Sequence, residues 1–216
     1  MKVAFAHNVY DRYSTLRDTI KLENQFFGDS TISVAHNGDL FIDLFQDVTN
    51  VKFCNFNQKT HKIGCVNGCI LSIQQLLNED FDVLIFSHDD VSINCKYFNI
   101  ITQCINEIDS GLYDVICRTP NNYYGSNYYM MEVFYMSKNV AIQIFEDLPI
   151  FEIEENIPRD VKNSISPEVW LFNILNNNNL KIKTFQFESN LNVYNKQLGE
   201  QMGFTHKNAG RRGWRD

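Results

Sequence analysis

The sequence predicts an α/β fold with a mostly parallel central sheet, helices on both faces and a small antiparallel portion. Two observations support this prediction. Short apolar runs rich in Val, Ile and Phe recur along the chain, and stretches of helical length separate most of them. The 216 residues, 44% hydrophobic and 21% charged, show no internal repeat and no interdomain linker, so we expect one domain over 1–216.

The first half of the chain alternates strands with helices. KVAFAHN predicts the first strand, and a helix follows from about Tyr13 to Phe27. STISVAHNGD predicts a second strand that ends in a polar turn, DLFIDLFQDV a short amphipathic segment, and VKFCNFN a third strand. A helix from about Gly64 to Asn78 then leads into DVLIFSHDD, the fourth strand.

The second half continues this alternation and adds one antiparallel strand. A helix from about Tyr97 to Ser110 precedes the strand YDVICRTP, and MMEVFYMSK predicts an antiparallel strand because only a short connection precedes it. A helix covers Asn139 to Asp147. Another helix, SPEVWLFNIL, has Ser166 as its N-cap and Pro167 at its first position, and the run of four asparagines ends it. LKIKTFQF is the last predicted strand, and a C-terminal tail follows it.

Composition narrows the class of protein. The net charge of -7 argues against a protein that coats nucleic acid, since such domains usually carry a basic face. No apolar run is long enough for a membrane span and the first residues do not resemble a signal peptide, so we expect a soluble, cytoplasmic protein. The six cysteines are expected to be free thiols, because Cys65 and Cys69 have no second pair to complete a zinc site. The abrupt end at Asp216 is compatible with one domain of a longer, multidomain enzyme.

Metal-binding side chains follow the fourth apolar run without a spacer. Val83–Phe86 is pure hydrocarbon, and Ser87, His88, Asp89 and Asp90 come next. Two adjacent carboxylates repel each other unless a cation or strong donors lie between them. Mg²⁺ and Mn²⁺ prefer carboxylate oxygens and keep positions open for phosphate, so the pattern favours a nucleoside diphosphate ligand. A surface turn with two solvated aspartates is the alternative.

Other polar residues are expected near the same edge of the sheet. Asn8 and Tyr10 follow the first strand and Asn37 to Asp39 the second, and ligands of open α/β sheets bind beyond the carboxyl ends of the strands. Asn37 to Asp39 is equally an ordinary turn sequence. The C-terminal THKNAGRRGWRD gathers cations that suit phosphate, together with His206, although a solvated basic tail has the same composition.

These residues resemble the glycosyltransferases of the GT-A fold, which use nucleotide-sugar donors. FAHNVYDRYSTLRDTI is similar to the opening strand and helix of family-2-type members, and STISVAHNGD to the strand whose end holds the nucleotide. HKIGCVNGCILSIQQLL resembles the helix that precedes the signature strand. DVLIFSHDDV stands in the place of the metal-binding DxD motif, with His88 or Ser87 at the motif's first position. The similarity covers roughly the first 120 residues.

The resemblance implies roles for single residues. Asp90 and Asp89 would bind the metal, with the chief ligand left open between them, and His206 would complete the metal shell. Glu168 would be the catalytic base of an inverting enzyme, with Asp160 a weaker competitor; an ordinary first-turn glutamate that complements the helix dipole is the alternative for Glu168. The expected contacts to the nucleotide sugar are Asn8, Tyr10, Arg12, Asn37, Asp39, Asn67, His88, Asp89, Lys207, Arg211 and Arg212.

The predicted function is therefore metal-dependent glycosyl transfer of the hexosyltransferase type, with Mn²⁺ or Mg²⁺ as cofactor. The donor is expected to be a UDP-sugar or another nucleoside diphosphate sugar, bound by residues 1–120. The acceptor, a glycan or another hydroxyl compound, is expected on residues 121–216, where the tyrosines of NNYYGSNYY either stack on sugar or pack over the sheet edge. Two alternatives stay open. A sugar-phosphate nucleotidyltransferase would usually have a glycine-rich loop where HNVYDRYSTLRD has no glycine, and a non-catalytic domain would bind carbohydrate or nucleotide without metal.

Overall fold

The computed structural model describes residues 1–9, 12–28, 30–36, 45–56, 61–120, 129–152, 166–187 and 191–206. In these ranges a seven-stranded sheet has the order β3-β2-β1-β4-β7-β6-β8. Its strands are β1 (Val3–Val9), β2 (Thr31–His36), β3 (Val51–Asn55), β4 (Val83–His88), β6 (Val115–Pro120), β7 (Val133–Ser137) and β8 (Ile182–Phe187).

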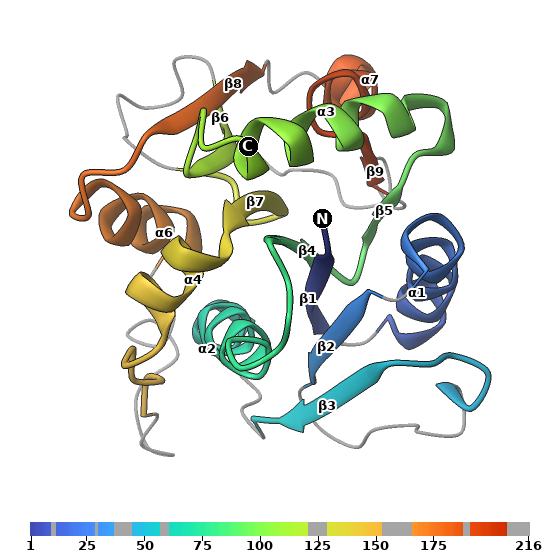
Figure 1. The fold of residues 1–216 in the computed structure, drawn as a ribbon, viewed down its shortest axis with the longest axis horizontal. Coiled ribbons are helices and arrows are strands. Elements are labelled where there is room, and N and C mark those ends of the chain that lie inside the picture. The colour runs from blue at the N-terminus through green and yellow to red at the C-terminus, as the bar shows by residue number, and fades with distance from the viewer. Residues whose placement is uncertain are drawn as a thin grey trace.

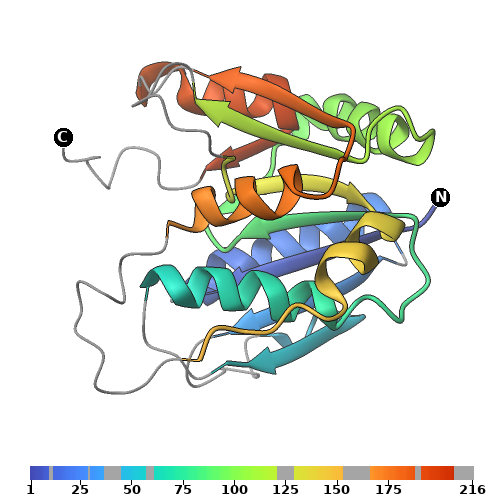
Figure 2. The ribbon, with the colours of Figure 1, turned by 90° about the vertical axis from the view of Figure 1, so that its left-hand side faces the viewer.

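The sheet is parallel except at β7, as the sequence predicted. β1 pairs in parallel with β2 and β4, β2 with β3, and β6 with β8. β7 lies between β4 and β6 and is antiparallel to both. Figure 2 shows its yellow arrow running against those of its neighbours. The mostly parallel α/β fold is therefore confirmed.

Helices cover both faces of the sheet (Figure 1). On one face lie α1 (Tyr13–Phe27), α3 (Phe98–Asp109) and α7 (Leu191–Met202). On the other lie α2 (His61–Gln74), α4 (Lys138–Phe145) and α6 (Pro167–Asn176). Helix α1 has the predicted bounds, whereas α2 begins and ends a few residues earlier than predicted and continues into turns.

Alternation along the strands divides the buried residues between these two faces. In β4, Val83 and Ile85 pack towards α1 and α3, while Leu84 and Phe86 pack towards α2 and α4. β1 follows the same rule, because successive side chains of a strand point to opposite faces. The last residues of β1 therefore have different neighbours: His7 faces α1 and Asn8 faces α2.

A second, two-stranded sheet corrects one sequence-based prediction. β5 (Val91–Ile93) pairs antiparallel with β9 (Phe204–His206), and helix α7 precedes β9. We had expected only a tail after β8. Helix α7 forms because its buried side chains share one face against the sheet, even though asparagines and a glycine interrupt its sequence. These side chains are Tyr194, Leu198 and Met202.

The cysteines are free thiols, as predicted, and three of them are buried. Among the described residues, no helix combines the length and the apolar character that crossing a membrane requires.

Candidate functional site

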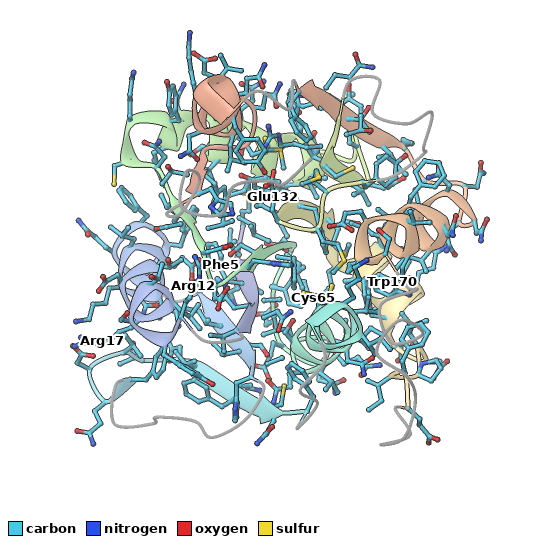
Figure 3. All side chains as sticks on the ribbon, turned by 180° about the vertical axis from the view of Figure 1, so that it is seen from behind. Phe5, Arg12, Arg17, Cys65, Glu132 and Trp170 are labelled. Atoms are coloured by element: carbon cyan, nitrogen blue, oxygen red, sulfur yellow. The ribbon has the colours of Figure 1, made fainter. Side chains whose placement is uncertain are left out.

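The candidate site lies where β1 and β4 end. The two strands are adjacent and parallel with Asn8 opposite His88, so the residues that follow them meet at one edge of the sheet. The backbone N–H of Arg12, just before α1, donates to Asp89 Oδ2 at 3.2 Å. Its guanidinium Nη1 lies 3.4 Å from Asp90 Oδ2. In Figure 3, Arg12 lies beside helix α1 in the interior of the view.

The two adjacent aspartates have different surroundings. Asp89 is only 7% exposed, and its backbone N–H donates to the carbonyl of Asn8 at 3.1 Å. Asp90 has a side chain that is 16% exposed and lies between two cationic or potentially cationic groups, Arg12 and His206. The repulsion between the two carboxylates is therefore offset on both residues. A solvated surface turn, the alternative for this pair, does not describe these contacts.

His206 reaches Asp90 through the small sheet. In the β5–β9 ladder His206 is opposite Val91, the residue after Asp90, and its Nε2 lies 3.3 Å from Asp90 Oδ2. The side chain of Asn195 on α7 holds the backbone of His206 on both sides: its Oδ1 accepts from the His206 N–H at 2.8 Å, and its Nδ2 donates to the His206 carbonyl at 3.1 Å. His206 thus has a fixed place on a strand.

Asp90 and His206 are spaced suitably for a divalent cation. Two ligands at right angles in the octahedral shell of a small divalent ion stand about 3 Å apart. Asp90 Oδ2 and His206 Nε2 are 3.3 Å apart, and they offer the oxygen and imidazole donors that Mn²⁺ accepts. Within the described ranges, no three His, Cys, Asp or Glu side chains gather as a complete metal site. The predicted metal role of Asp89, Asp90 and His206 stays a prediction.

Asn8 and His88, predicted contacts of the nucleotide sugar, lie near the ends of β1 and β4 that lead into this site, and Asn67, a third predicted contact, lies on α2. Asn8 donates from Nδ2 to the Cys65 carbonyl at 3.3 Å, and a Cβ at Gly68 would lie 2.2 Å from Asn8 Oδ1. Asn67 is fully buried and binds both backbone groups of Phe151. The hydrogen bond of Asn8 thus joins β1 to α2, and those of Asn67 join α2 to the backbone of Phe151. Their contact with a ligand stays a prediction.

The predicted base lies at the start of α6. Ser166 is at the N-cap, as predicted, but its hydroxyl donates to Glu168 Oε2 at 2.8 Å and makes no capping bond to the backbone. Tyr129, which we considered for sugar stacking, is buried, bonds to Asn176 and packs on Phe172 with ring centroids 5.0 Å apart. For Tyr129, packing is the interpretation that the structure favours.

A buried ion pair beside the site was not predicted. Glu132, just before β7, is 8% exposed and accepts from Arg118 Nη1 at 2.5 Å and from the Tyr194 hydroxyl. Its backbone carbonyl accepts from the N–H of His88 at 3.1 Å. Burial raises the pKa of Glu132, Arg118 opposes that rise, and the Asp90 and Glu168 carboxylates add to it. Glu132 is therefore within electrostatic reach of both candidate functional carboxylates.

The signal for this pair was present in the sequence. Glu132 interrupts the apolar run MMEVFYM and Arg118 interrupts VICRTP, and a charge inside a buried strand usually has a partner. Several predicted residues lie outside the described ranges: Tyr10, Asn37, Asp39, Asp160, Lys207, Arg211, Arg212 and the tyrosines at 123, 124 and 128.

The fold places the chain in a structural class. The architecture is the GT-A-like fold of nucleotide-diphospho-sugar transferases. A glycosyltransferase involved in glycosylation of the major capsid of PBCV-1 has a TM-score of 0.53 and 11% identity, over 95% of this chain and 92% of that one. A putative nucleotide-diphospho-sugar transferase from Desulfovibrio desulfuricans G20 has a TM-score of 0.50 and 11% identity, over 92% of this chain and 88% of that one.

A longer protein is similar over part of its length. S. aureus TarS 1-349 has a TM-score of 0.51 and 13% identity over 86% of this chain, and the chain covers 58% of that structure. It covers 35% of the longer TarS structure, which has a TM-score of 0.54 and 12% identity. No protein-family model matches the sequence, and a comparison with curated proteins finds no match. These likenesses establish the fold, and function has to be argued from the site.

Proposed function

We propose that the protein is a metal-dependent glycosyltransferase that moves a sugar from a UDP-sugar, or another nucleoside diphosphate sugar, to a hydroxyl acceptor. One observation carries the proposal: Asp90 lies between Arg12 and His206 at the adjoining ends of β1 and β4. Two solved structures that match over more than nine-tenths of this chain are a glycosyltransferase and a putative nucleotide-diphospho-sugar transferase. The fold and the donor groups of the site therefore favour the same class of reaction.

In this proposal, some side chains of the site bind the metal ion and others contact the nucleotide sugar. Asp90 and His206 would hold Mn²⁺ or Mg²⁺, which would supply positive charge for the diphosphate leaving group. Asp89, held by the backbone N–H of Arg12, would make a contact next to the metal. Arg12 carries a guanidinium that suits phosphate oxygens. His88 Nε2 is buried and has no hydrogen-bond partner within the described part of the chain, which fits a ligand atom beside it.

Glu168 is the candidate general base for an inverting reaction. Its carboxylate accepts a hydrogen bond from Ser166, and its charge, like that of Asp90, raises the pKa of Glu132. A carboxylate in this position can accept the proton of the acceptor hydroxyl as the new glycosidic bond forms. A retaining reaction would need no such base, and Glu168 would then orient the acceptor.

The test measures UDP release from a panel of UDP-sugars with Mn²⁺ and with EDTA. The wild type should release UDP only with the metal, and Asp90→Asn should lower the rate at least about a hundredfold, as expected when a metal ligand and its charge are lost. Asp109→Asn, at an exposed position on α3, makes the same chemical change away from the site and should keep the wild-type rate. No release, no transfer and no metal-dependent binding of any nucleotide sugar would overturn the proposal.

A further inference from the structure

A closed ring of hydrogen bonds ties helix α7 to the central sheet. From α7, the Tyr194 hydroxyl donates to Glu132 Oε2. Arg118 Nη1 donates to Glu132 Oε1 at 2.5 Å, and Arg118 Nε donates to Gln201 Oε1 at 3.1 Å, back on α7. Tyr194 and Gln201 are seven residues apart, which is about two helical turns, so they present the same face of α7. We call these four residues the α7 ring.

The α7 ring is buried and charged. The Arg118 side chain has no exposed surface, and its guanidinium carbon lies 4.2 Å from the ring centroid of Phe187 and 4.9 Å from that of Tyr194. Burial lowers the pKa of Arg118, while Glu132 opposes that change. A buried ion pair is weak evidence for stability, since apolar residues of similar volume often serve as well. Within the described residues Arg118 Nη2 has no hydrogen-bond partner, so the network is not fully satisfied. Its three hydrogen bonds still join α7 to β6 and to the residue before β7, and such a network favours one arrangement of the elements that it joins.

Glu132 is linked to both Asp90 and His206, through its backbone carbonyl to the first and through its carboxylate to the second. Its backbone carbonyl accepts from the N–H of His88, which precedes Asp89 and Asp90. Its carboxylate holds Tyr194, whose ring meets the ring of His206 edge-on with centroids 6.2 Å apart. The residue after Tyr194 is Asn195, which binds both backbone groups of His206. Glu132 thus lies between strand β4, which ends two residues before Asp90, and helix α7, which holds His206. Figure 3 shows Glu132 in the interior, apart from Arg12.

We propose that Glu132 is a positioning residue that sets the spacing between Asp90 and His206 through the α7 ring. The inference rests on the proposed function, because that spacing matters for a divalent ion shared by the two side chains. Removing a group that hydrogen-bonds directly to a metal ligand typically changes metal affinity by about 10- to 100-fold, and we expect the lower end of this range for the ring. Among the described residues, no side chain of the α7 ring forms a hydrogen bond with Asp90 or His206. The effect of the ring on these two residues must therefore pass through helix α7 and strand β4.

The test compares Mn²⁺ affinity in four proteins by electron paramagnetic resonance of the free ion. Glu132→Gln removes the charge, and Tyr194→Phe removes one hydroxyl and keeps the aromatic packing. Each should weaken Mn²⁺ binding about tenfold or more relative to the wild type. Tyr113→Phe is the matched control, since this half-buried tyrosine lies before β6, and its ring contacts Lys183 and the core beside α3, outside the site. It should bind Mn²⁺ within about twofold of the wild type.

Urea unfolding of the same proteins separates positioning from general loss of stability. At a temperature where a variant is fully folded, lower global stability alone does not change Mn²⁺ affinity. If Glu132→Gln does not fold, Tyr194→Phe carries the test. The inference would be overturned if the wild type binds Mn²⁺ and a folded Tyr194→Phe variant binds it with an affinity within twofold of the wild type. That result would leave the proposed function standing. Wild type that binds no Mn²⁺, alone or with UDP, would overturn both.

Discussion

Gly203 joins helix α7 to strand β9, and its replacement by alanine should be unusually damaging. Its φ is +79°, and a Cβ there would lie 2.2 Å from Ile101 Cγ1 and 3.1 Å from the Ile101 backbone nitrogen. A left-handed φ costs a residue with a Cβ about 1–2 kcal/mol. Overpacking a buried contact adds about 1–3 kcal/mol. Gly203→Ala should therefore lower the free energy of unfolding by about 2–5 kcal/mol.

Gly111 provides the matched control. Its φ is +71°, and a Cβ there would meet nothing within 4 Å. Gly111→Ala should lower the free energy of unfolding only by the cost of the left-handed φ, about 1–2 kcal/mol. Urea unfolding followed by circular dichroism measures both values. Equal losses in the two variants would refute the reasoning, because they would show that contact with Ile101 does not set the position of β9. Gly203→Ala should also weaken Mn²⁺ binding, since β9 carries His206, whereas Gly111→Ala should not.

Three further predictions concern the core and the buried titratable groups. Phe134→Ala should destabilise the protein by about 3–5 kcal/mol in urea unfolding, because this fully buried ring stacks on Phe86 at 4.9 Å; a loss under about 1 kcal/mol would contradict the packing. Burial raises the pKa of Cys54 to about 11, so its alkylation rate, read by peptide mass spectrometry, should rise about tenfold per unit between roughly pH 8 and pH 10, and a flat rate would contradict this. Burial also raises the pKa of Glu23, although His7 opposes the rise. A carboxyl whose pKa is raised on folding favours the folded state at low pH, so the wild type should lose stability relative to Glu23→Gln as the pH rises above 4.5; a gap independent of pH would refute this.

Much of the sheet could be predicted because its signals are local. Apolar runs such as Val83–Phe86 are buried on both faces, as expected for parallel strands between two helical layers. The antiparallel direction of β7 also followed from the sequence. A positive group near Asp90 could also be predicted, because the adjacent carboxylate of Asp89 makes a compensating charge necessary. In the structure the Arg12 guanidinium lies on one side of Asp90 and the His206 imidazole on the other, and these two residues are far apart in the sequence.

The contacts that hold His206 could not be predicted, because they depend on tertiary structure. Helix α7 has the stripe Tyr194, Leu198 and Met202, but asparagines and Gly199 weaken its intrinsic propensity. Gly199 is where α7 meets Tyr97: a Cβ there would lie 2.4 Å from that ring. Likewise Arg118 on β6 and Glu132 just before β7 are fourteen residues apart, and only the pairing of these two strands makes them partners.

The most direct test of the account is a crystal structure of the protein with UDP and Mn²⁺, with diffraction data collected at the manganese absorption edge. An anomalous peak in contact with both Asp90 and His206, and with the diphosphate on its open side, is the predicted result. A nucleotide bound elsewhere, or a diphosphate held by Arg12 alone with no metal signal beside Asp90, would contradict it.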